Sequence, residues 1–310
     1  MSARHYHIAV ILINYNSTRY TINCINSIQK NTDPTLHYQI IVVDNNSREE
    51  EFDHLISGVD QTKIIVVKSR LNVGFSGANM MGVQVADADY YYFLNNDCLL
   101  LNDCLKILYT FMESEPRVAN CSGEMFNSEG VYEYNFRYFP TLKLKLLGSS
   151  FLRLFSPADF PDKYTRLTKP TRVDLVNGSS MFVRATSFEE IGGFDTNYFL
   201  YCEEEDLALR LRRTGWLTYL VPDARYQHFE NKSSETNSPI RLPFLREFYI
   251  SLLYYYSKNY NGVYRICIQT LLFFKLARKF YKHLGYAQLA FFVVRGAPVK
   301  YSLRFKQRIK

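Results

Sequence analysis

Short apolar runs alternate along the first half of the chain with stretches whose apolar residues recur at helical spacing. The apolar runs are rich in Val and Ile and cover residues 8–13, 39–43 and 63–67. Continuous β-branched runs are typical of strands that are covered on both faces. Between the first two runs, Ile22, Ile25 and Ile28 recur every three residues, as on the buried face of a helix. Asn16 or Ser17 can cap this predicted helix.

The same alternation continues through an aromatic segment. Residues 90–94 predict a fourth strand, because Tyr and Phe are enriched in strands. Residues 103–112 predict a helix with Leu105, Leu108 and Met112 on one face. This β-α-β-α order predicts an α/β fold with a largely parallel central sheet flanked by helices.

Polar residues follow each predicted strand. They are Asn14-Tyr15-Asn16, Asp44-Asn45-Asn46-Ser47, Asn72 and Asn95-Asn96-Asp97. The carboxyl ends of parallel strands meet at one edge of a sheet, where open α/β folds bind their ligands, so this pattern predicts a metal or sugar-nucleotide site. Ordinary turns are the alternative, because Asn and Asp are common in turns. Gly74 and Gly77 would let the backbone approach a ligand closely. No GxGxxG or GxxxxGK[ST] motif supports a dehydrogenase or a P-loop NTPase.

Four consecutive acids, Glu203 to Asp206, begin a later predicted helix. Carboxylates in a first turn stabilise the helix dipole by about 0.3–1 kcal/mol each, so capping is one interpretation. Helical spacing places Glu204 on one face with Leu207, and we therefore expect apolar surroundings and a raised pKa that suits a general base. Asp206 can pair with Arg210 four positions along the helix.

The regular alternation breaks between residues 125 and 172. We interpret this segment as an insertion on the acceptor side or a membrane-facing flap, with a variable surface loop as the alternative. A strand pair joined by a turn is predicted over 173–183, and a strand closed by Pro222 over 217–221. His228 stands alone after it, and such a residue is more often packed or exposed than a ligand.

The C-terminal region differs in charge and pattern. Residues 258–310 hold 12 Lys or Arg and no acid, whereas residues 1–257 hold 25 bases and 30 acids. Helices are predicted over 248–256 and 263–274. The bases Lys275, Arg278, Lys279 and Lys282 then align with Leu272, Leu276 and Phe280 as a basic amphipathic helix. Such a helix suits an anionic membrane surface; nucleic acid is the rival, disfavoured by the long apolar runs.

Length and cysteine usage limit the remaining possibilities. The 310 residues suit one large α/β domain over 1–240 with a smaller helical element over 241–310. Six cysteines without a CxxC pair indicate reduced, mostly buried thiols of a cytosolic protein. The apolar run at 8–13 is too short for a signal peptide, and no window has the roughly 18 apolar residues of a membrane span. We therefore expect a cytoplasmic protein that lies on the membrane.

The motifs together resemble the family 2 glycosyltransferases of GT-A fold, and among them the bacterial rhamnosyltransferases. The resemblance covers roughly residues 7–230. It is carried by the first two strands with their polar ends, by residues 72–79 and 94–97, and by Phe199-Leu200-Tyr201 with Glu203, Glu204, Asp206 and Leu207.

The resemblance implies a role for each motif. Asp97 stands in the family's DxD-type motif and would bind Mg²⁺ or Mn²⁺, and His228 resembles a late His that helps to hold this metal. Glu204 stands where the family has its catalytic base, with Glu203, Asp206 and Arg210 as acceptor-side or supporting residues. The nucleotide-sugar positions are Asn14, Tyr15, Asp44, Asn72, Gly74, Asn95 and Asn96. Because Asn95 replaces the first acid of DxD, we assign it to the nucleotide.

The implied function is inverting, metal-dependent transfer of rhamnose from a dTDP-linked donor to a lipid-linked saccharide. The partners would be the nucleotide-sugar, the lipid-linked acceptor and the inner face of the cell membrane, and no nucleic acid. A UDP-sugar donor is the alternative within this family. A non-catalytic binding protein on a degenerate transferase fold is the alternative outside it.

Overall fold

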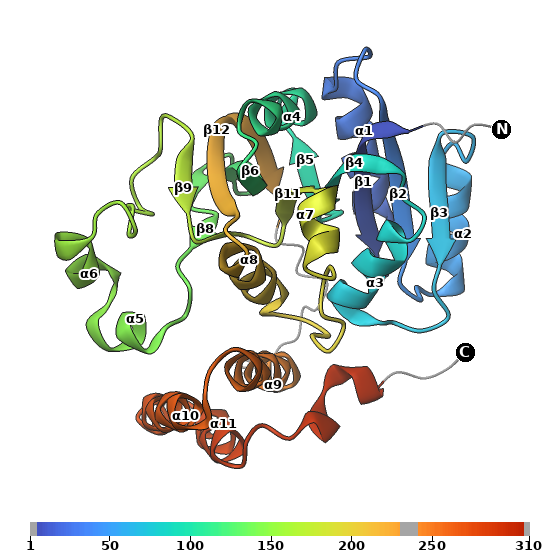
Figure 1. Ribbon diagram of the computed structural model, residues 1–310. Helices are drawn as coiled ribbons and strands as arrows, with labels where there is room; N and C mark the ends of the chain where they lie inside the picture. Colours follow the sequence, from blue (N-terminus) through green and yellow to red (C-terminus); the bar gives the residue numbers. More distant parts are fainter. Residues whose placement is uncertain (1–4, 230–240, 307–310) are drawn as a thin grey trace.

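The computed structural model describes residues 5–229 and 241–306 and contains a central sheet between two layers of helices (Figure 1). The first half consists of β1 (Tyr6–Asn14), α1 (Thr18–Asn31), β2 (Tyr38–Asp44), α2 (Glu49–Gly58), β3 (Ile64–Lys68), α3 (Gly74–Val83), β4 (Ala88–Leu94), β5 (Cys98–Leu100) and α4 (Cys104–Ser114). The predicted strands and helices of this half are confirmed, with ends that differ by one or two residues. The reason is the strong apolar periodicity of these segments.

The second half begins with β6 and ends with a long strand. It consists of β6 (Val118–Phe126), β7 (Tyr132–Glu133), β8 (Phe136–Arg137), α5 (Leu142–Leu147), α6 (Ser149–Phe155), β9 (Thr171–Val173), β10 (Leu175–Val176), β11 (Ser180–Arg184), α7 (Ala185–Glu190), α8 (Glu203–Arg213) and β12 (Leu217–His228). The main sheet has the order β3-β2-β1-β4-β11-β6-β12-β5. It is parallel from β3 to β4 and between β6 and β12, and β11 lies antiparallel between β4 and β6.

Two apolar clusters cover the two faces of the sheet. On one face, α1, α2 and α4 pack against alternate residues of the strands, including Val10 and Tyr92. On the other face, α3, α7 and α8 pack against the intervening residues, including Ile11 and Phe93. Side chains alternate between the faces of a strand, so both clusters draw on the same continuous apolar runs. This confirms the α/β class and the central sheet flanked by helices.

Two strand predictions for the second half are wrong in detail. Residues 173–183 do not form a hairpin: β10 pairs with β8, and β11 pairs with β4 and β6. Pro222 does not end the last strand, because β12 continues to His228. Its pairing with β6 shifts register between Leu220 and Arg225, and such an irregularity accommodates a proline inside a strand.

The C-terminal region packs as a helical layer beneath the sheet domain in the view of Figure 1. It comprises α9 (Leu242–Asn259), α10 (Gly262–Ala277), α11 (Leu284–Val294) and two 3₁₀ turns, η1 (Val299–Tyr301) and η2 (Leu303–Lys306). A third apolar cluster joins these helices to Tyr198 and Cys202 of the sheet domain. The predicted basic helix is shorter than expected, because α10 ends at Ala277 and Lys279 and Lys282 lie in the turn that follows it.

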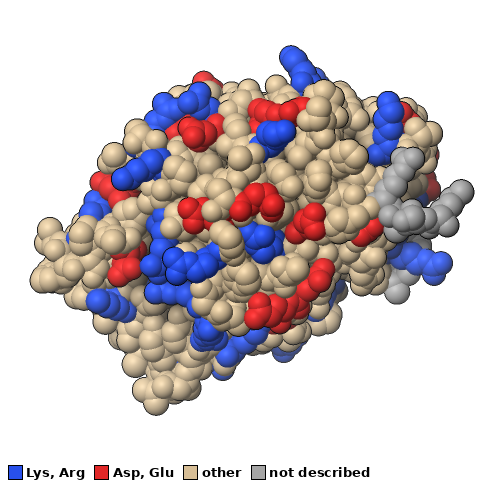
Figure 2. Space-filling model, turned by 45° about the horizontal axis from the view of Figure 1, so that its top comes forward, with Lys and Arg blue, Asp and Glu red and all other residues tan. Residues whose placement is uncertain are grey.

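Charge and cysteine placement agree with a folded α/β protein. On the face shown in Figure 2, Lys and Arg are intermixed with Asp and Glu, unlike the single-sign stripe typical of nucleic-acid-binding proteins. All six cysteines are free, and Cys267 is the exposed one, which confirms the predicted reduced and mostly buried thiols. Across residues 5–229 and 241–306, no helix combines the length and apolarity needed to cross a bilayer.

Candidate active site

A cavity of about 430 Å³ opens at the carboxyl ends of β1, β2 and β4. Its lining includes Tyr15, Asn45, Asn72, Gly74, Asn95, Asn96 and Asp97. The strand order reverses direction at β1, since β2 follows on one side and β4 on the other. Open α/β sheets bind ligands at such a reversal. The predicted meeting of the polar strand ends is confirmed.

Asn14 and Asp44 support the loops of this cavity from within the protein. Both are fully buried and do not line the cavity. The Nδ2 of Asn14 donates to Oδ1 of Asp44 over 2.9 Å, and Oδ2 of Asp44 accepts from the backbone N–H of Ser47 over 3.1 Å. These contacts join the ends of β1 and β2 and hold the two loops that do reach the cavity. The positioning of Tyr15 and Asn45 therefore depends on them.

Asn45 and Asn72 form the neighbouring wall. The Nδ2 of Asn45 donates to Oδ1 of Asn72 over 3.0 Å, and Oδ1 of Asn45 accepts from the backbone N–H of Val73 over 2.9 Å. Asn45 was missing from the predicted site residues, although its place after β2 was the available signal. Together the two amides keep the loop before α3 against the end of β2.

Gly74 is required by backbone conformation and by space. Its φ is +77°, which residues with a Cβ rarely adopt. A Cβ there would also lie 2.1 Å from the carbonyl oxygen of Phe199. The adjacent Phe75 N–H donates to the same oxygen over 2.8 Å. This contact brings the segment before α8 to the cavity wall.

The Asn95-Asn96-Asp97 turn is held on both sides. The Nδ2 of Asn96 donates to the hydroxyls of Ser17 and Thr21, each over 2.7 Å. The backbone N–H of Asn95 donates to the carbonyl of Ser179 over 2.9 Å. The Asn96 side chain is therefore held against the start of α1. Asp97 lines both this cavity and a neighbouring cavity of about 320 Å³.

Asp97 and His228 meet at this boundary. The Oδ1 of Asp97 lies 3.3 Å from Nε2 of His228. Pairing of β5 with β12 places His228 beside Cys98, and one ligand atom from each of the three residues lies within 4.8 Å of the others. Burial raises the pKa of the Cys98 thiol well above its usual value, and hard cations such as Mg²⁺ prefer oxygen ligands to sulfur. A carboxylate oxygen and an imidazole nitrogen fit a divalent cation that takes its other ligands from a diphosphate.

The acids at the start of α8 face an arginine. Tyr201 and Cys202 precede them with φ values of 74° and 65°, a conformation in which non-glycine residues are uncommon. Arg137 of β8 pairs with Oε1 of Glu204, and its Nη1 lies 2.9 Å from Oε1 of Glu205. The prediction of apolar surroundings for Glu204 is therefore wrong, because Arg137, 67 residues earlier in the chain, places a cation beside it.

The same cluster lacks hydrogen-bond partners for several buried atoms. Among the described residues, the Oε2 atoms of Glu203, Glu204 and Glu205 have none. Burial, and next the charge of Glu204, raises the pKa of Glu203 well above its usual value and that of Glu205 to about 8. A Cβ added to Gly178 would lie 3.6 Å from the Glu204 carboxylate, so this carboxylate faces the loop that supports Asn95. Buried polar atoms without protein partners are uncommon, so these oxygens are available to a water, an ion or a substrate.

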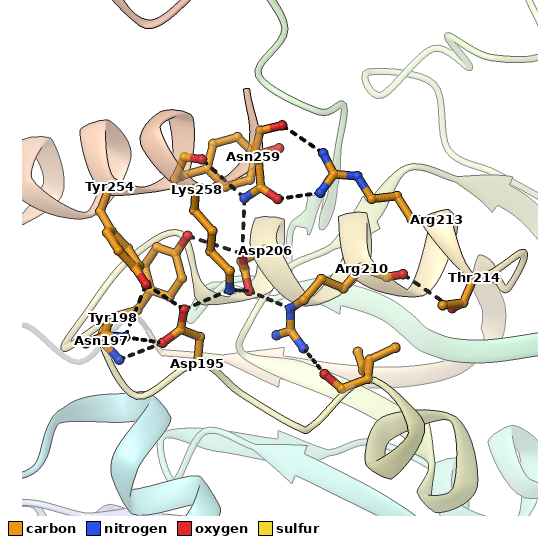
Figure 3. A network of polar contacts seen from close by, with 12 residues as sticks. Asp195, Asn197, Tyr198, Asp206, Arg210, Arg213, Thr214, Tyr254, Lys258 and Asn259 are labelled. Atoms are coloured by element: carbon orange, nitrogen blue, oxygen red, sulfur yellow. Dashed lines mark hydrogen bonds and ion pairs between the residues drawn. The ribbon is translucent and has the colours of Figure 1, made fainter. Parts of the chain in front are cut away.

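Asp206 has the opposite surroundings. Its carboxylate is fully buried and accepts from Nε of Arg210 over 2.7 Å, from Nζ of Lys258 over 2.9 Å and from Nδ2 of Asn259 over 3.1 Å (Figure 3). The predicted pair with Arg210 is confirmed. Lys258 and Asn259 belong to the end of α9, so Asp206 joins the sheet domain to the C-terminal helices.

The C-terminal region also reaches the first cavity. Phe244 of α9 and Leu303 of η2 line it together with Phe199 and Leu200. Glu247 is buried and accepts from the backbone N–H of Leu303 over 2.7 Å, which fixes η2 against α9. The sequence contained no signal for this contact, because neither residue belongs to a polar motif.

Comparisons with known proteins agree with this architecture. Residues 9–192 match the family model described as Glycosyl transferase family 2. The chain is 32% identical over 211 residues to the rhamnosyltransferase WbbL of Escherichia coli (strain K12), which covers 64% of this chain and 76% of WbbL. It is 42% identical over 62 residues to an N-acetylglucosaminyl-diphospho-decaprenol L-rhamnosyltransferase of Mycobacterium tuberculosis (strain CDC 1551 / Oshkosh). These 62 residues are 20% of this chain and 20% of that protein.

Two solved structures show the same fold. GalNAc-T7 in a crystal structure with UDP, GalNAc and Mn²⁺ has a TM-score of 0.56 at 16% identity, covering 82% of this chain and 50% of that one. Residues 1–349 of S. aureus TarS in complex with UDP have a TM-score of 0.54 at 15% identity, covering 89% and 72%. The chain therefore has a fold of GT-A type. More narrowly, the chain belongs to glycosyl transferase family 2.

Proposed function

We propose that this enzyme transfers rhamnose from dTDP-rhamnose, with inversion at the anomeric carbon, to a saccharide carried on a lipid diphosphate. The similarity to two rhamnosyltransferases supports the sugar, and the name of the mycobacterial relative supports the lipid carrier. The observation that carries the mechanism is the buried, unpartnered Oε2 of Glu204 beside the loop that holds Asn95.

The donor would lie in the 430 Å³ cavity. Tyr15 lines the cavity and is 43% exposed, which suits contact with a nucleobase. Asn45, Asn72 and Asn95 offer amide and backbone groups for the nucleoside. Asp97 and His228 would hold Mg²⁺ or Mn²⁺, and such an ion supplies neutralisation of the diphosphate that leaves with the broken glycosidic bond.

Glu204 would accept the proton of the attacking hydroxyl. Arg137 holds its Oε1, which orients the carboxylate and leaves Oε2 for the acceptor. The hydroxyl oxygen forms the new bond to the anomeric carbon as the bond to the diphosphate breaks, and its proton passes to Glu204. Direct displacement of this kind inverts the anomeric centre and needs no covalent nucleophile.

The enzyme would work at the inner face of the cell membrane. Exposed apolar side chains gather on α5 and α6, and Leu146, Leu147, Phe151, Leu154 and Phe155 are 47–77% exposed. Together with the basic C-terminal region, they suit an anionic lipid surface without crossing it.

The test measures transfer by purified protein to a short-chain prenyl-diphospho-saccharide, with dTDP-rhamnose or UDP-sugars and with Mg²⁺, Mn²⁺ or a chelator. We expect cation-dependent transfer from dTDP-rhamnose. Asp97→Asn should weaken nucleotide binding in the presence of the cation, whereas Glu50→Gln, an exposed acid on α2, should change nothing. Transfer from a UDP-sugar alone would replace the proposed donor, and full activity of Asp97→Asn would refute the proposed diphosphate site.

A further inference from the structure

A separate cleft, of about 760 Å³, lies between α5 and α10, away from the two cavities that Asp97 lines. Apolar side chains from both helices line it, among them Leu144 and Leu272. Three cations also line it, namely Lys145, Lys275 and Arg278. No Asp or Glu is part of this lining. The cleft thus combines a positive charge of three with an apolar wall, a combination that suits an amphipathic anion.

The three cations have no protein partner within the described ranges. None of them forms an ion pair or a side-chain hydrogen bond with residues 5–229 or 241–306. All three side chains are exposed to solvent, and the pKa of Lys145 is lowered, first by the protein atoms around it and next by the charge of Lys275. Exposed like charges repel one another only weakly through water, and a bound anion would interact favourably with all three.

The walls of the cleft are held in place by contacts between its two sides. The hydroxyl of Tyr264, on α10, accepts from the backbone N–H of Leu142 at the start of α5. The hydroxyl of Tyr256, on α9, donates to the carbonyl of Pro140. Tyr256 is fully buried in the C-terminal apolar cluster. The segment before α5 is therefore fixed to the C-terminal helices, and the cleft is a formed site rather than a gap beside a loose loop.

The cleft adjoins the acid cluster. The chain runs from Arg137, which pairs with Glu204 and Glu205, directly into α5 and Lys145. The Glu205 carboxylate lies close enough to Lys145 to oppose the lowering of its pKa. On its outer side, α5 continues into α6, where Leu154 and Phe155 are 77% and 73% exposed. Along the chain, α5 thus connects the arginine that pairs with the proposed catalytic base to the helix proposed to face lipid.

We propose that this cleft binds the diphosphate and the first isoprenoid units of a lipid-linked acceptor, with Lys145, Lys275 and Arg278 on the phosphate oxygens. The inference rests on the proposed function, which requires such an acceptor. Charge-assisted contacts from several cations are the usual means of holding a diphosphate, and the leucines would contact the prenyl chain. The acceptor sugar would then extend toward Glu204.

The experiment uses farnesyl diphosphate as a soluble isoprenoid diphosphate and titrates it calorimetrically into the full chain with dTDP and Mg²⁺ saturating the donor cavity. Lys145→Gln with Lys275→Gln should weaken binding about 10-fold or more per removed cation. Lys30→Gln, which changes an exposed cation on α1 that forms no ion pair within residues 5–229 and 241–306, is the matched control and should bind as the wild type does. Binding of dTDP should be the same in all three proteins, which excludes a folding defect.

Other outcomes would overturn the proposal. Equal affinity of the double variant and the wild type for farnesyl diphosphate would do so. Equal binding of inorganic pyrophosphate would leave an anion site without an isoprenoid subsite. Binding of phosphatidylglycerol vesicles without farnesyl diphosphate binding would indicate a general lipid contact. Farnesyl diphosphate binding that depends on both lysines, without transfer from any nucleotide-sugar, would instead refute the proposed function and leave this site standing.

Discussion

The first turn of α8 carries Glu204 on one side and Asp206 on the other, and the surroundings of these two carboxylates are opposite. Glu204 faces β8 and the loop at Gly178 and keeps one buried oxygen without a partner in the described structure. Asp206 faces α9, is fully buried, and binds Arg210, Lys258 and Asn259. A fully partnered carboxylate stabilises the fold, whereas an unpartnered one is available for a substrate.

The difference shows that the run of four acids is not one functional unit. Residues two positions apart on a helix point about 200° apart, so Glu204 and Asp206 must contact different parts of the protein. Substitution of each should therefore affect a different measurement.

The largest effect is expected for Glu204→Gln. Gln retains the shape but cannot accept the proton, so kcat should fall by about 10²–10⁴-fold while dTDP affinity and melting temperature stay close to the wild-type values. Steady-state kinetics and calorimetry measure these quantities. Wild-type turnover in this variant would show that the open side of the turn is not catalytic.

The next effect is expected for Asp206→Asn. It removes the charge that Arg210 and Lys258 share and leaves Lys258 with Asp195 alone, which should cost about 2 kcal/mol of unfolding free energy. Urea unfolding measures the loss, with Asp223→Asn as an exposed control. An unchanged unfolding midpoint would contradict a structural role for this side of the turn.

A smaller, pH-dependent effect is expected for Glu205→Gln. The pKa of Glu205 is raised from its ordinary value of 4.5 to about 8. The folded state therefore binds more protons than the unfolded state between these values, and stability decreases as the pH rises through this range. Gln cannot ionise, so the variant should gain about 1 kcal/mol or more relative to wild type between pH 5 and pH 9.

Melting curves at both pH values measure this gain, and Glu50→Gln provides an exposed control. A difference between variant and wild type that is the same at pH 5 and pH 9 would show that Glu205 ionises as an ordinary carboxylate, and would weaken the contrast between the two sides of α8.

Much of the cavity proposed to bind the donor could be predicted from the sequence because its determinants are local. The β-branched runs and the polar residues after them predicted parallel strands with Asn72 and Asp97 at one edge, and the structure brings these residues to one cavity. The prediction did not separate Asn14 and Asp44, which support the loops, from Asn45, which lines the cavity. Neighbouring residues at a strand end point in different directions, and residue type alone does not decide which of them is buried.

The contacts of α8 and of the C-terminal helices depend on residues far apart in the chain. The sequence by itself determined the α/β class, the family motifs and the pairing of Asp206 with Arg210, because these follow from periodicity and short spacing. Only the tertiary structure decided that Arg137 binds Glu204, that Lys258 binds Asp206 and that Lys145 meets Lys275 across a cleft. Such contacts require the packing of whole elements against one another, and no periodic pattern in the chain specifies which elements meet.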